Sequence, residues 1–352
     1  MDKTGREFSA VLNACREKML ASGSVETLRQ LLDRMKKYYG GRRQFAEKTK
    51  NGTVYYTTDT FYDDVRAVGQ MLLSLGGNVH AAVVGENSYN WLTAFFAAAA
   101  SGNVAVPIDK ELTDDKIAIL AEKADCRVMF FSASYSGAAE RFVEGGGGRL
   151  AVCIGGNARN IKCADIDGVK ASVTDFSDFD RAEPKKDGVA AIIFTSGTTG
   201  ANKGVMLTHG NFCSDFTGLA HAIKPINTAM SVLPMNHVYE LSCVDMTAIY
   251  VNALLYINDS LRHLERNLRE FRPEAMAAVP ALLDSLCNGI VMRAREEGKL
   301  KKLLRGVKIS DFLMKFGIDI RRFLFADVTE RFGCNFPAIA VGGSPVNGEK
   351  TS

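Results

Sequence analysis

The sequence lacks the paired cysteines and the cysteine–histidine spacing that mark metal sites and disulfide frameworks. Its eight cysteines are scattered, and no two of them form a Cys-x-x-Cys motif. The acidic residues between 160 and 188 also lack the glycine and glutamate spacing of a calcium loop. These absences predict reduced, mostly buried thiols in a cytoplasmic protein, and no metal held by protein ligands alone.

Long hydrophobic runs are absent as well. The longest, around 91–100, is too short to span a bilayer, and 1–20 carries charge throughout, unlike a signal peptide. We therefore expect a cytoplasmic protein, and contact with a membrane surface stays open. A basic stretch is typical of a solvated helix face, and membrane contact is the alternative for the same residues. It consists of Lys299, Lys301, Lys302, Arg305 and Lys308.

An excess of one charge is also missing. The chain has 43 basic and 40 acidic residues, a net charge of +3, which argues against a nucleic-acid partner. Its 352 residues, of which 47% are hydrophobic, suit two domains or subdomains. Apolar strands alternate with helices of about a dozen residues, a pattern typical of parallel sheets. We predict an α/β fold of two doubly wound, mainly parallel subdomains, at 44–185 and 186–352, after a helical segment at 1–43.

The most informative stretch is 189–212, VAAIIFTSGTTGANKGVMLTHGNF. An apolar strand at 189–194 leads into small residues and a lysine, and a second short strand precedes a helix that His209 is expected to cap. The glycines allow backbone N–H groups to approach an anion, the hydroxyls donate hydrogen bonds and the lysine supplies charge. The spacing differs from a Walker A loop. We predict a polyphosphate-binding flap between two strands, formed by Thr195, Ser196, Gly197, Thr198, Thr199, Gly200 and Lys203.

Three later strands each end in a distinctive loop. The loops are Pro-Met-Asn-His at 234–237, Val-Pro at 279–280 and Gly-Gly-Ser-Pro at 342–345. Ligands of open parallel sheets bind outside the carboxyl ends of the strands. The three loops should therefore converge on one crevice near the predicted phosphate flap.

These motifs, in this order, resemble those of the adenylate-forming superfamily. Thr-Ser-Gly-Thr-Thr-Gly-x-x-Lys-Gly at 195–204 resembles the superfamily signature. Leu-Pro-Met-Asn-His-Val-Tyr-Glu at 233–240 is similar to a block of the long-chain acyl-CoA synthetases, and 278–283 and 342–346 match later blocks. The resemblance runs from Asp59 to Val346.

The resemblance implies a fatty acid:CoA ligase that uses ATP, Mg²⁺ and coenzyme A. A carboxylate would attack the α-phosphate, pyrophosphate would leave, and a thiol would capture the acyl-adenylate. Lys203 and His237 would be catalytic, with His237 and Glu240 contacting the substrate. The loop that contacts adenine would be Gly342, Gly343, Ser344 and Pro345.

The family's later motifs do not occur in these 352 residues. They include Tyr-Gly-x-Thr-Glu, a ribose-binding aspartate and a C-terminal domain with a catalytic lysine. We therefore expect 1–352 to be an incomplete N-terminal AMP-binding domain that binds nucleotide weakly and turns over little. Two alternatives stay open: a non-catalytic nucleotide- or acyl-binding module, and acyl transfer to a carrier-protein thiol.

Overall fold

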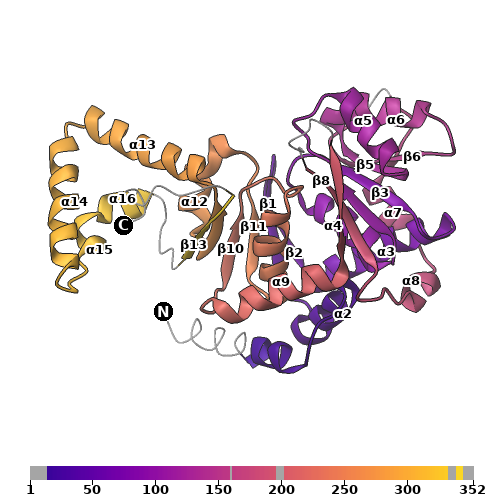
Figure 1. The fold of residues 1–352 in the computed structure, drawn as a ribbon, viewed down its shortest axis with the longest axis horizontal. Coiled ribbons are helices and arrows are strands. Elements are labelled where there is room, and N and C mark those ends of the chain that lie inside the picture. The colour runs from indigo at the N-terminus through magenta and orange to yellow at the C-terminus, as the bar shows by residue number, and fades with distance from the viewer. Residues whose placement is uncertain (1–13, 159–160, 196–201, 332–337, 344–352) are drawn as a thin grey trace.

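The computed structural model describes residues 14–158, 161–195, 202–331 and 338–343. Figure 1 shows a mixed α/β architecture with two sheets and a group of C-terminal helices that extends away from them. Both sheets are mainly parallel, so the predicted fold class is confirmed. Each sheet carries one antiparallel pair, at an edge.

The seven-stranded sheet has the order β7-β6-β5-β3-β4-β8-β9. Its strands run parallel except for the edge hairpin of β8 and β9. The carboxyl ends of its parallel strands therefore lie along one edge. The strands are β3 (His80–Val84), β4 (Val104–Pro107), β5 (Cys126–Ser132), β6 (Leu150–Gly155), β7 (Ala164–Asp165), β8 (Val189–Thr195) and β9 (Lys203–Thr208).

The six-stranded sheet has the order β13-β12-β10-β11-β1-β2. It is parallel except for the hairpin of β1 and β2. Three of its strands, β10, β12 and the edge strand β13, end at the loops predicted to form the crevice. The strands are β1 (Arg43–Thr49), β2 (Gly52–Thr57), β10 (Thr228–Ser231), β11 (Leu254–Ile257), β12 (Ala275–Ala278) and β13 (Ala338–Val341).

The two sheets do not follow the predicted division into 44–185 and 186–352. β1 and β2, from the first segment, pair with β11, and β8 and β9, from the second, pair with β4. Burial explains why each strand joins the sheet of the other segment. Phe45 and Ala46 of β1 are fully buried in the six-stranded sheet, and Ala190 and Ala191 of β8 are fully buried in the seven-stranded sheet. Each sheet is thus completed by strands from the other half of the sequence.

Helix α4 (Tyr89–Ala100) is the centre of the main core. Every residue in it except Asn90 is buried, as expected for a helix that is apolar on all sides. It packs against α3, α2 and strands of both sheets.

The other helices fall into two groups along the chain. Those before residue 190 are α2 (Leu28–Tyr39), α3 (Thr58–Ser74), α5 (Asp114–Lys123), α6 (Ser136–Glu144), α7 (Ile166–Ser172) and α8 (Ser177–Arg181), with the 3₁₀ turn η1 (Ala133–Tyr135). Those after it are α9 (His209–Ala222), α10 (Val238–Glu240), α11 (Thr247–Tyr250), α12 (Leu264–Phe271), α13 (Pro280–Glu296), α14 (Leu300–Met314), α15 (Arg321–Leu324) and α16 (Ala326–Arg331), with the 3₁₀ turn η3 (Leu261–His263) and the π-helix η2 (Leu241–Met246).

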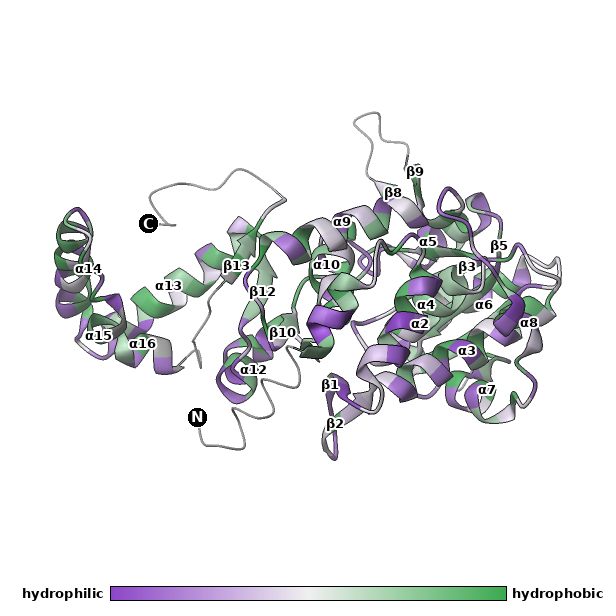
Figure 2. Ribbon diagram, turned by 90° about the horizontal axis from the view of Figure 1, so that it is seen from below, coloured by the Kyte–Doolittle hydropathy of each residue, from purple (hydrophilic) through white to green (hydrophobic). Residues whose placement is uncertain are grey.

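Helices α13–α15 carry many exposed hydrophobic side chains. Figure 2 shows hydrophobic residues along α13 and α14, and Met292, Phe312 and Phe323 are 62%, 60% and 85% exposed. In the described segments, no helix has both the length and the apolar character required for a bilayer span. The cysteines of the described residues are free thiols, but only Cys126, Cys153 and Cys213 are buried, so the prediction of mostly buried thiols was too strong.

Candidate active site

The predicted phosphate flap is the connection between β8 and β9. Thr195, the last residue of β8, is the register partner of Lys203, the first of β9, so the connection lies between two strands as predicted. Lys203 is exposed, and no side-chain hydrogen bond or ion pair joins it to another described residue. Ser196, Gly197, Thr198, Thr199 and Gly200 lie outside the described residues, so their contact with phosphate stays a prediction.

A second lysine reaches this hairpin from helix α5. Lys123 donates a hydrogen bond from Nζ to the carbonyl oxygen of Asn202, which directly precedes Lys203, at 2.5 Å. No local pattern in the sequence marks this contact, because 79 residues separate the pair. Lys123 and Lys203 thus both lie where β9 begins. Two cations there create the positive potential that a polyphosphate requires.

The loop after β10 presents His237 to solvent. His237 is the N-cap residue of α10; its N–H donates to the carbonyl of Pro234 at 3.0 Å, and its own carbonyl accepts from Leu241 N–H at 3.1 Å. The imidazole is exposed and makes no hydrogen bond to another described residue. A rigid turn thus holds a ring whose nitrogens are free for a ligand.

The three strand-end loops meet, as predicted from topology. Gly342 N–H donates to the carbonyl of Ala278 at 3.2 Å. A β-carbon at Gly342 would approach the ring of Tyr239 to 2.9 Å, and one at Gly343 would lie 3.4 Å from Val279. Only glycine at 342 allows the backbone to lie this close to the tyrosine ring. Ser344 and Pro345 lie outside the described residues.

Glu240 does not have the surroundings predicted for a substrate contact. It is completely buried, and Oε1 accepts the N–H of Val232 at 2.8 Å. Asp245, on the π-helical turn that follows, is also completely buried. Burial raises the pKa of both carboxyl groups, because it disfavours their charged forms. Glu240 has no exposed atom for a substrate, so the predicted contact is corrected to a contact with the protein backbone.

His209 is a structural residue and does not cap its helix. Thr208 is the N-cap of α9, and it forms a capping box with Asn211. His209 is buried, and its Nδ1 accepts the N–H of Leu28 at 3.3 Å. Burial lowers its pKa to about 4, so the ring is neutral at physiological pH.

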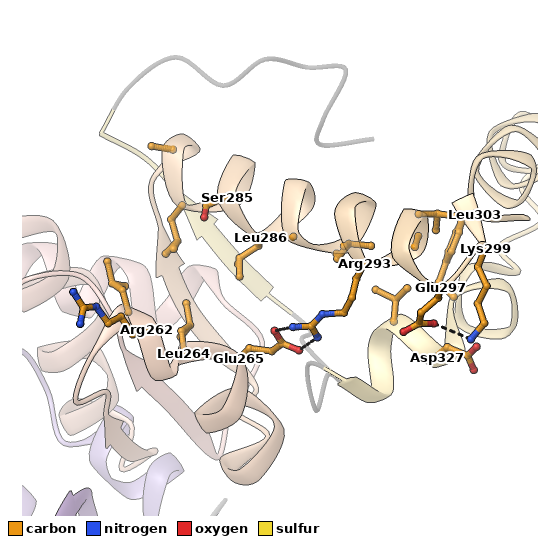
Figure 3. A pocket seen from close by; sticks show the side chains of 18 of the residues that line it. Arg262, Leu264, Glu265, Ser285, Leu286, Arg293, Glu297, Lys299, Leu303 and Asp327 are labelled. Carbon is orange, nitrogen blue, oxygen red and sulfur yellow. Dashed lines mark hydrogen bonds and ion pairs between the residues drawn. The ribbon is translucent and has the colours of Figure 1, made fainter. Parts of the chain in front are cut away.

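An apolar groove of about 580 Å³ begins beside the strand ends (Figure 3). Leu233, which precedes the loop at 234–237, and Val279, the first residue of the loop at 279–280, line it together with Leu286 of α13. Arg293 of α13 pairs across the groove with Glu265 of α12, with Nη2 2.8 Å from Oε2. The other apolar lining residues include Leu261, Leu264, Leu282, Ile290, Leu303, Leu324, Phe325 and Val328.

Carboxylates, imidazoles and thiols do not cluster as metal ligands. Among the described residues, no group of three or more His, Cys, Asp or Glu side chains could hold a metal ion.

Comparison with known proteins places these features in one family. A family model described as AMP-binding enzyme matches residues 34–349. Long chain acyl-CoA synthetase 4 of Arabidopsis thaliana is 24% identical over 337 residues, 87% of this chain and 50% of that protein. Long-chain-fatty-acid--CoA ligase 4 of Saccharomyces cerevisiae is 30% identical over 184 residues, 47% of this chain and 25% of that protein. The chain thus spans at most half the length of these relatives.

Solved structures show the same fold at low sequence identity. The adenylation domain of a carboxylate reductase from Mycobacterium chelonae has a TM-score of 0.72 at 17% identity, covering 97% of this chain and 57% of that one. The inhibitor-bound N-terminal domain of FACL13 from Mycobacterium tuberculosis has a TM-score of 0.67 at 18% identity, covering 93% and 72%. Since the family model spans most of the sequence and both architectures agree, the chain belongs to the AMP-binding enzyme family.

Proposed function

We propose that the chain is the nucleotide- and acyl-binding part of an ATP-dependent acyl-CoA synthetase, a fatty acid:CoA ligase. The observation that carries the proposal is the meeting of the loops at 234–237, 279–280 and 342–343 at the carboxyl ends of parallel strands. Because the chain spans at most half of the relatives' length, the complete reaction is a proposal and is not assigned to residues 1–352 alone.

The residues suit an in-line transfer of adenylate. A carboxylate oxygen of the substrate attacks the α-phosphorus of ATP and the bond to pyrophosphate breaks. The thiol of coenzyme A then attacks the acyl carbon and releases AMP. Lys203 and Lys123 stabilise the negative charge of the departing pyrophosphate, and His237 donates hydrogen bonds beside the acyl carbonyl and the α-phosphate. Mg²⁺ neutralises phosphate charge when bound. Adenine lies against Gly342 and Gly343.

The acyl chain lies in the apolar groove between α12, α13 and α14. Its volume of about 580 Å³ falls within the usual range for ligand pockets, and most of its lining is aliphatic. One end is next to the loop that carries His237, where the carboxylate must react. A long hydrocarbon chain fits these two features better than a short acid does.

A membrane surface is the source from which such a substrate would be taken up. On α14, Lys301, Arg305 and Lys308 follow each other at spacings of four and three residues, and the exposed Leu304 and Phe312 lie between and beside them. These spacings place the five side chains on one helix face, where cations and apolar groups together favour an anionic lipid interface. The protein would then be cytoplasmic and peripheral to the membrane.

Substitution of Lys203 by alanine tests the nucleotide site. Isothermal titration of Mg²⁺–ATP into the chain should show binding that Lys203→Ala weakens at least tenfold, because the substitution removes a cation from the hairpin mouth. Lys116→Ala on α5 is the matched control: this lysine is also exposed, and its loss should leave the affinity unchanged. Unchanged binding by Lys203→Ala would place the phosphates elsewhere. A folded chain that binds no ATP would favour an acyl-binding module without nucleotide chemistry.

Gly289 provides a test of the acyl groove. It lines the groove from α13, and a β-carbon there would meet no atom within 4 Å, so Gly289→Phe introduces a ring at the groove from a position that tolerates a side chain. We expect palmitate affinity, measured by displacement of a fluorescent fatty acid, to fall at least tenfold while ATP affinity is unchanged. Gly218→Phe, at an equally open and exposed position on α9, should change neither. Equal palmitate affinity in wild type and Gly289→Phe would show that the chain binds outside the groove.

A further inference from the structure

The segment that carries His237 has no sheet partner of its own. The last ladder contact of β10 on this side is the hydrogen bond from Asn258 N–H to the carbonyl of Ser231. Beyond it, Val232, Leu233 and Met235 are buried. Buried backbone groups need hydrogen-bond partners, so other parts of the protein must supply them.

Asn87 supplies two of these partners from the other sheet. It follows β3 of the seven-stranded sheet, and its side-chain amide faces the loop after β10 of the six-stranded sheet. Nδ2 donates to the carbonyl of Leu233 at 2.7 Å, and Oδ1 accepts the N–H of Met235 at 3.1 Å. A side-chain amide offers one donor and one acceptor side by side, as a neighbouring strand would. Asn87 therefore joins the carboxyl ends of the two sheets.

The loop that carries Asn87 is itself fixed in place. Glu86 N–H donates to Oγ of Ser132, at the end of β5, at 3.3 Å. A β-carbon at Gly85 would lie 2.1 Å from the same oxygen, so only glycine allows this close packing. Asn87 thus presents its amide from an anchored position, which is the requirement for a residue that positions another.

Glu240 supplies a further partner for the same segment. Its Oε1 accepts the N–H of Val232 at 2.8 Å, and the side chain is completely buried. Glu240 is also the last residue of α10, the turn for which His237 is the N-cap. The same carboxyl group therefore ties the end of β10 to the turn that presents the imidazole.

We propose that Asn87 and Glu240 are positioning residues that hold three backbone groups of the 232–237 loop and thereby set the place of His237. Asn87 makes that position depend on the contact between the two sheets. The inference rests on the proposed function in one respect, namely that His237 contacts the acyl-adenylate.

We call the hydrogen bonds of Asn87 and Glu240 to the 232–237 loop the clamp. Hydrogen–deuterium exchange tests the clamp without reference to function. In Asn87→Ala, the amide of Met235 should exchange at least tenfold faster. Asn87→Asp keeps the acceptor for Met235 N–H but places a second oxygen against the Leu233 carbonyl, so it should speed the exchange to a smaller degree. Glu240→Gln keeps an acceptor oxygen for Val232 N–H, and it checks that the fold tolerates replacement of the buried carboxyl group by an amide. Asn90→Ala is the control: it lies three residues along and bonds Ile154 and Lys170 instead. Unchanged Met235 exchange in Asn87→Ala would overturn the proposal.

A double-mutant cycle tests whether the clamp acts through His237. The ligand is a palmitoyl-sulfamoyl adenosine, a stable analogue of the acyl-adenylate, and its affinity is measured by calorimetry. Asn87→Ala and His237→Ala should each weaken binding about tenfold, and the double variant should lose little more, because coupled residues are not additive. Additive losses would leave Asn87 a purely structural residue and refute the coupling. If wild type does not bind the analogue, the proposed function fails, and the exchange experiment still decides the clamp.

Discussion

Replacing Asp245 by asparagine is expected to make the stability of the chain markedly less sensitive to alkaline pH. Asp245 and Glu240 are both fully buried, and neither Asp245 oxygen has a hydrogen-bond partner among the described residues. The second oxygen of Glu240 and the hydroxyl of Ser231 are likewise unpartnered there. Burial is the main cause that raises both pKa values, and for Asp245 the charge of Glu240 adds to it. The buried pair therefore keeps protons that the unfolded chain releases.

The sign of the effect follows from proton linkage. In the unfolded chain both carboxyl groups ionise near their ordinary pKa, around 4. In the folded chain burial raises the pKa of Glu240 to about 8 and that of Asp245 well above its ordinary value. At pH values between the unfolded and the folded pKa of each group, the folded state binds more protons than the unfolded state. The free energy of unfolding therefore falls as pH rises, by up to about 1.4 kcal/mol per pH unit for each proton retained. Asp245→Asn removes one of these protons and the repulsion between the two carboxylates.

Urea unfolding at pH 5.5, 7.0 and 8.5, followed by circular dichroism, measures the effect. Wild type should lose stability steadily across this range, and Asp245→Asn should show a shallower slope and be the more stable protein at pH 8.5. Asp311→Asn, which changes an exposed carboxylate on α14, should keep the wild-type slope. Identical slopes for wild type and Asp245→Asn, or a wild-type stability that rises with pH, would contradict buried, protonated carboxyl groups.

This buried pair also shows where sequence reasoning ended. The pattern around 239–251 predicts one regular helix, but the chain forms α10, a π-helical turn and α11. A π-turn adds a residue to the helical repeat and so rotates the side chains that follow it. From its sequence position, Glu240 is expected to be an exposed carboxylate in the first turn of a helix. The residues next to it in the sequence do not indicate that it is buried beside Ser231 and Asp245.

Features encoded in short segments were predicted well. The strands Val189–Thr195, Lys203–Thr208 and Ala338–Val341 follow from short apolar runs next to small residues, a signal that lies within each segment itself. The strand-end loops followed from the rule that parallel strands share an edge. These inferences needed no knowledge of the tertiary contacts.

Features that depend on contacts between distant segments were not predictable in the same way. β1 carries the same pattern of residues whether it pairs with β11 or with a strand of the other sheet. The contacts of its buried residues come from distant segments: Phe45 lies in the core around α4, and Ala46 packs in the cluster that contains Met230 and Leu264. Asn87 and Lys123 are likewise ordinary polar residues until the fold brings their partners to them, 146 and 79 residues away.

Replacing Phe95 by alanine is expected to produce the largest loss of stability among single changes in the main core. Phe95 lies in the middle of α4 and is 0% exposed. Its ring centroid is 5.9 Å from that of Trp91, 5.7 Å from Phe96 and 6.1 Å from Phe212 of α9. The substitution leaves a cavity between a helix of the first half of the chain and one of the second. Such changes typically cost about 3–5 kcal/mol.

The exposed Phe323 of α15 is the matched control, because Phe323→Ala removes the same atoms from a side chain that is 85% exposed. It should alter the free energy of unfolding by no more than about 0.5 kcal/mol. Urea unfolding followed by far-ultraviolet circular dichroism is the appropriate measurement, since the fluorescence of Trp91 would change with its neighbour. A loss below about 1 kcal/mol for Phe95→Ala would mean that α4 is not the common core of the two sheets.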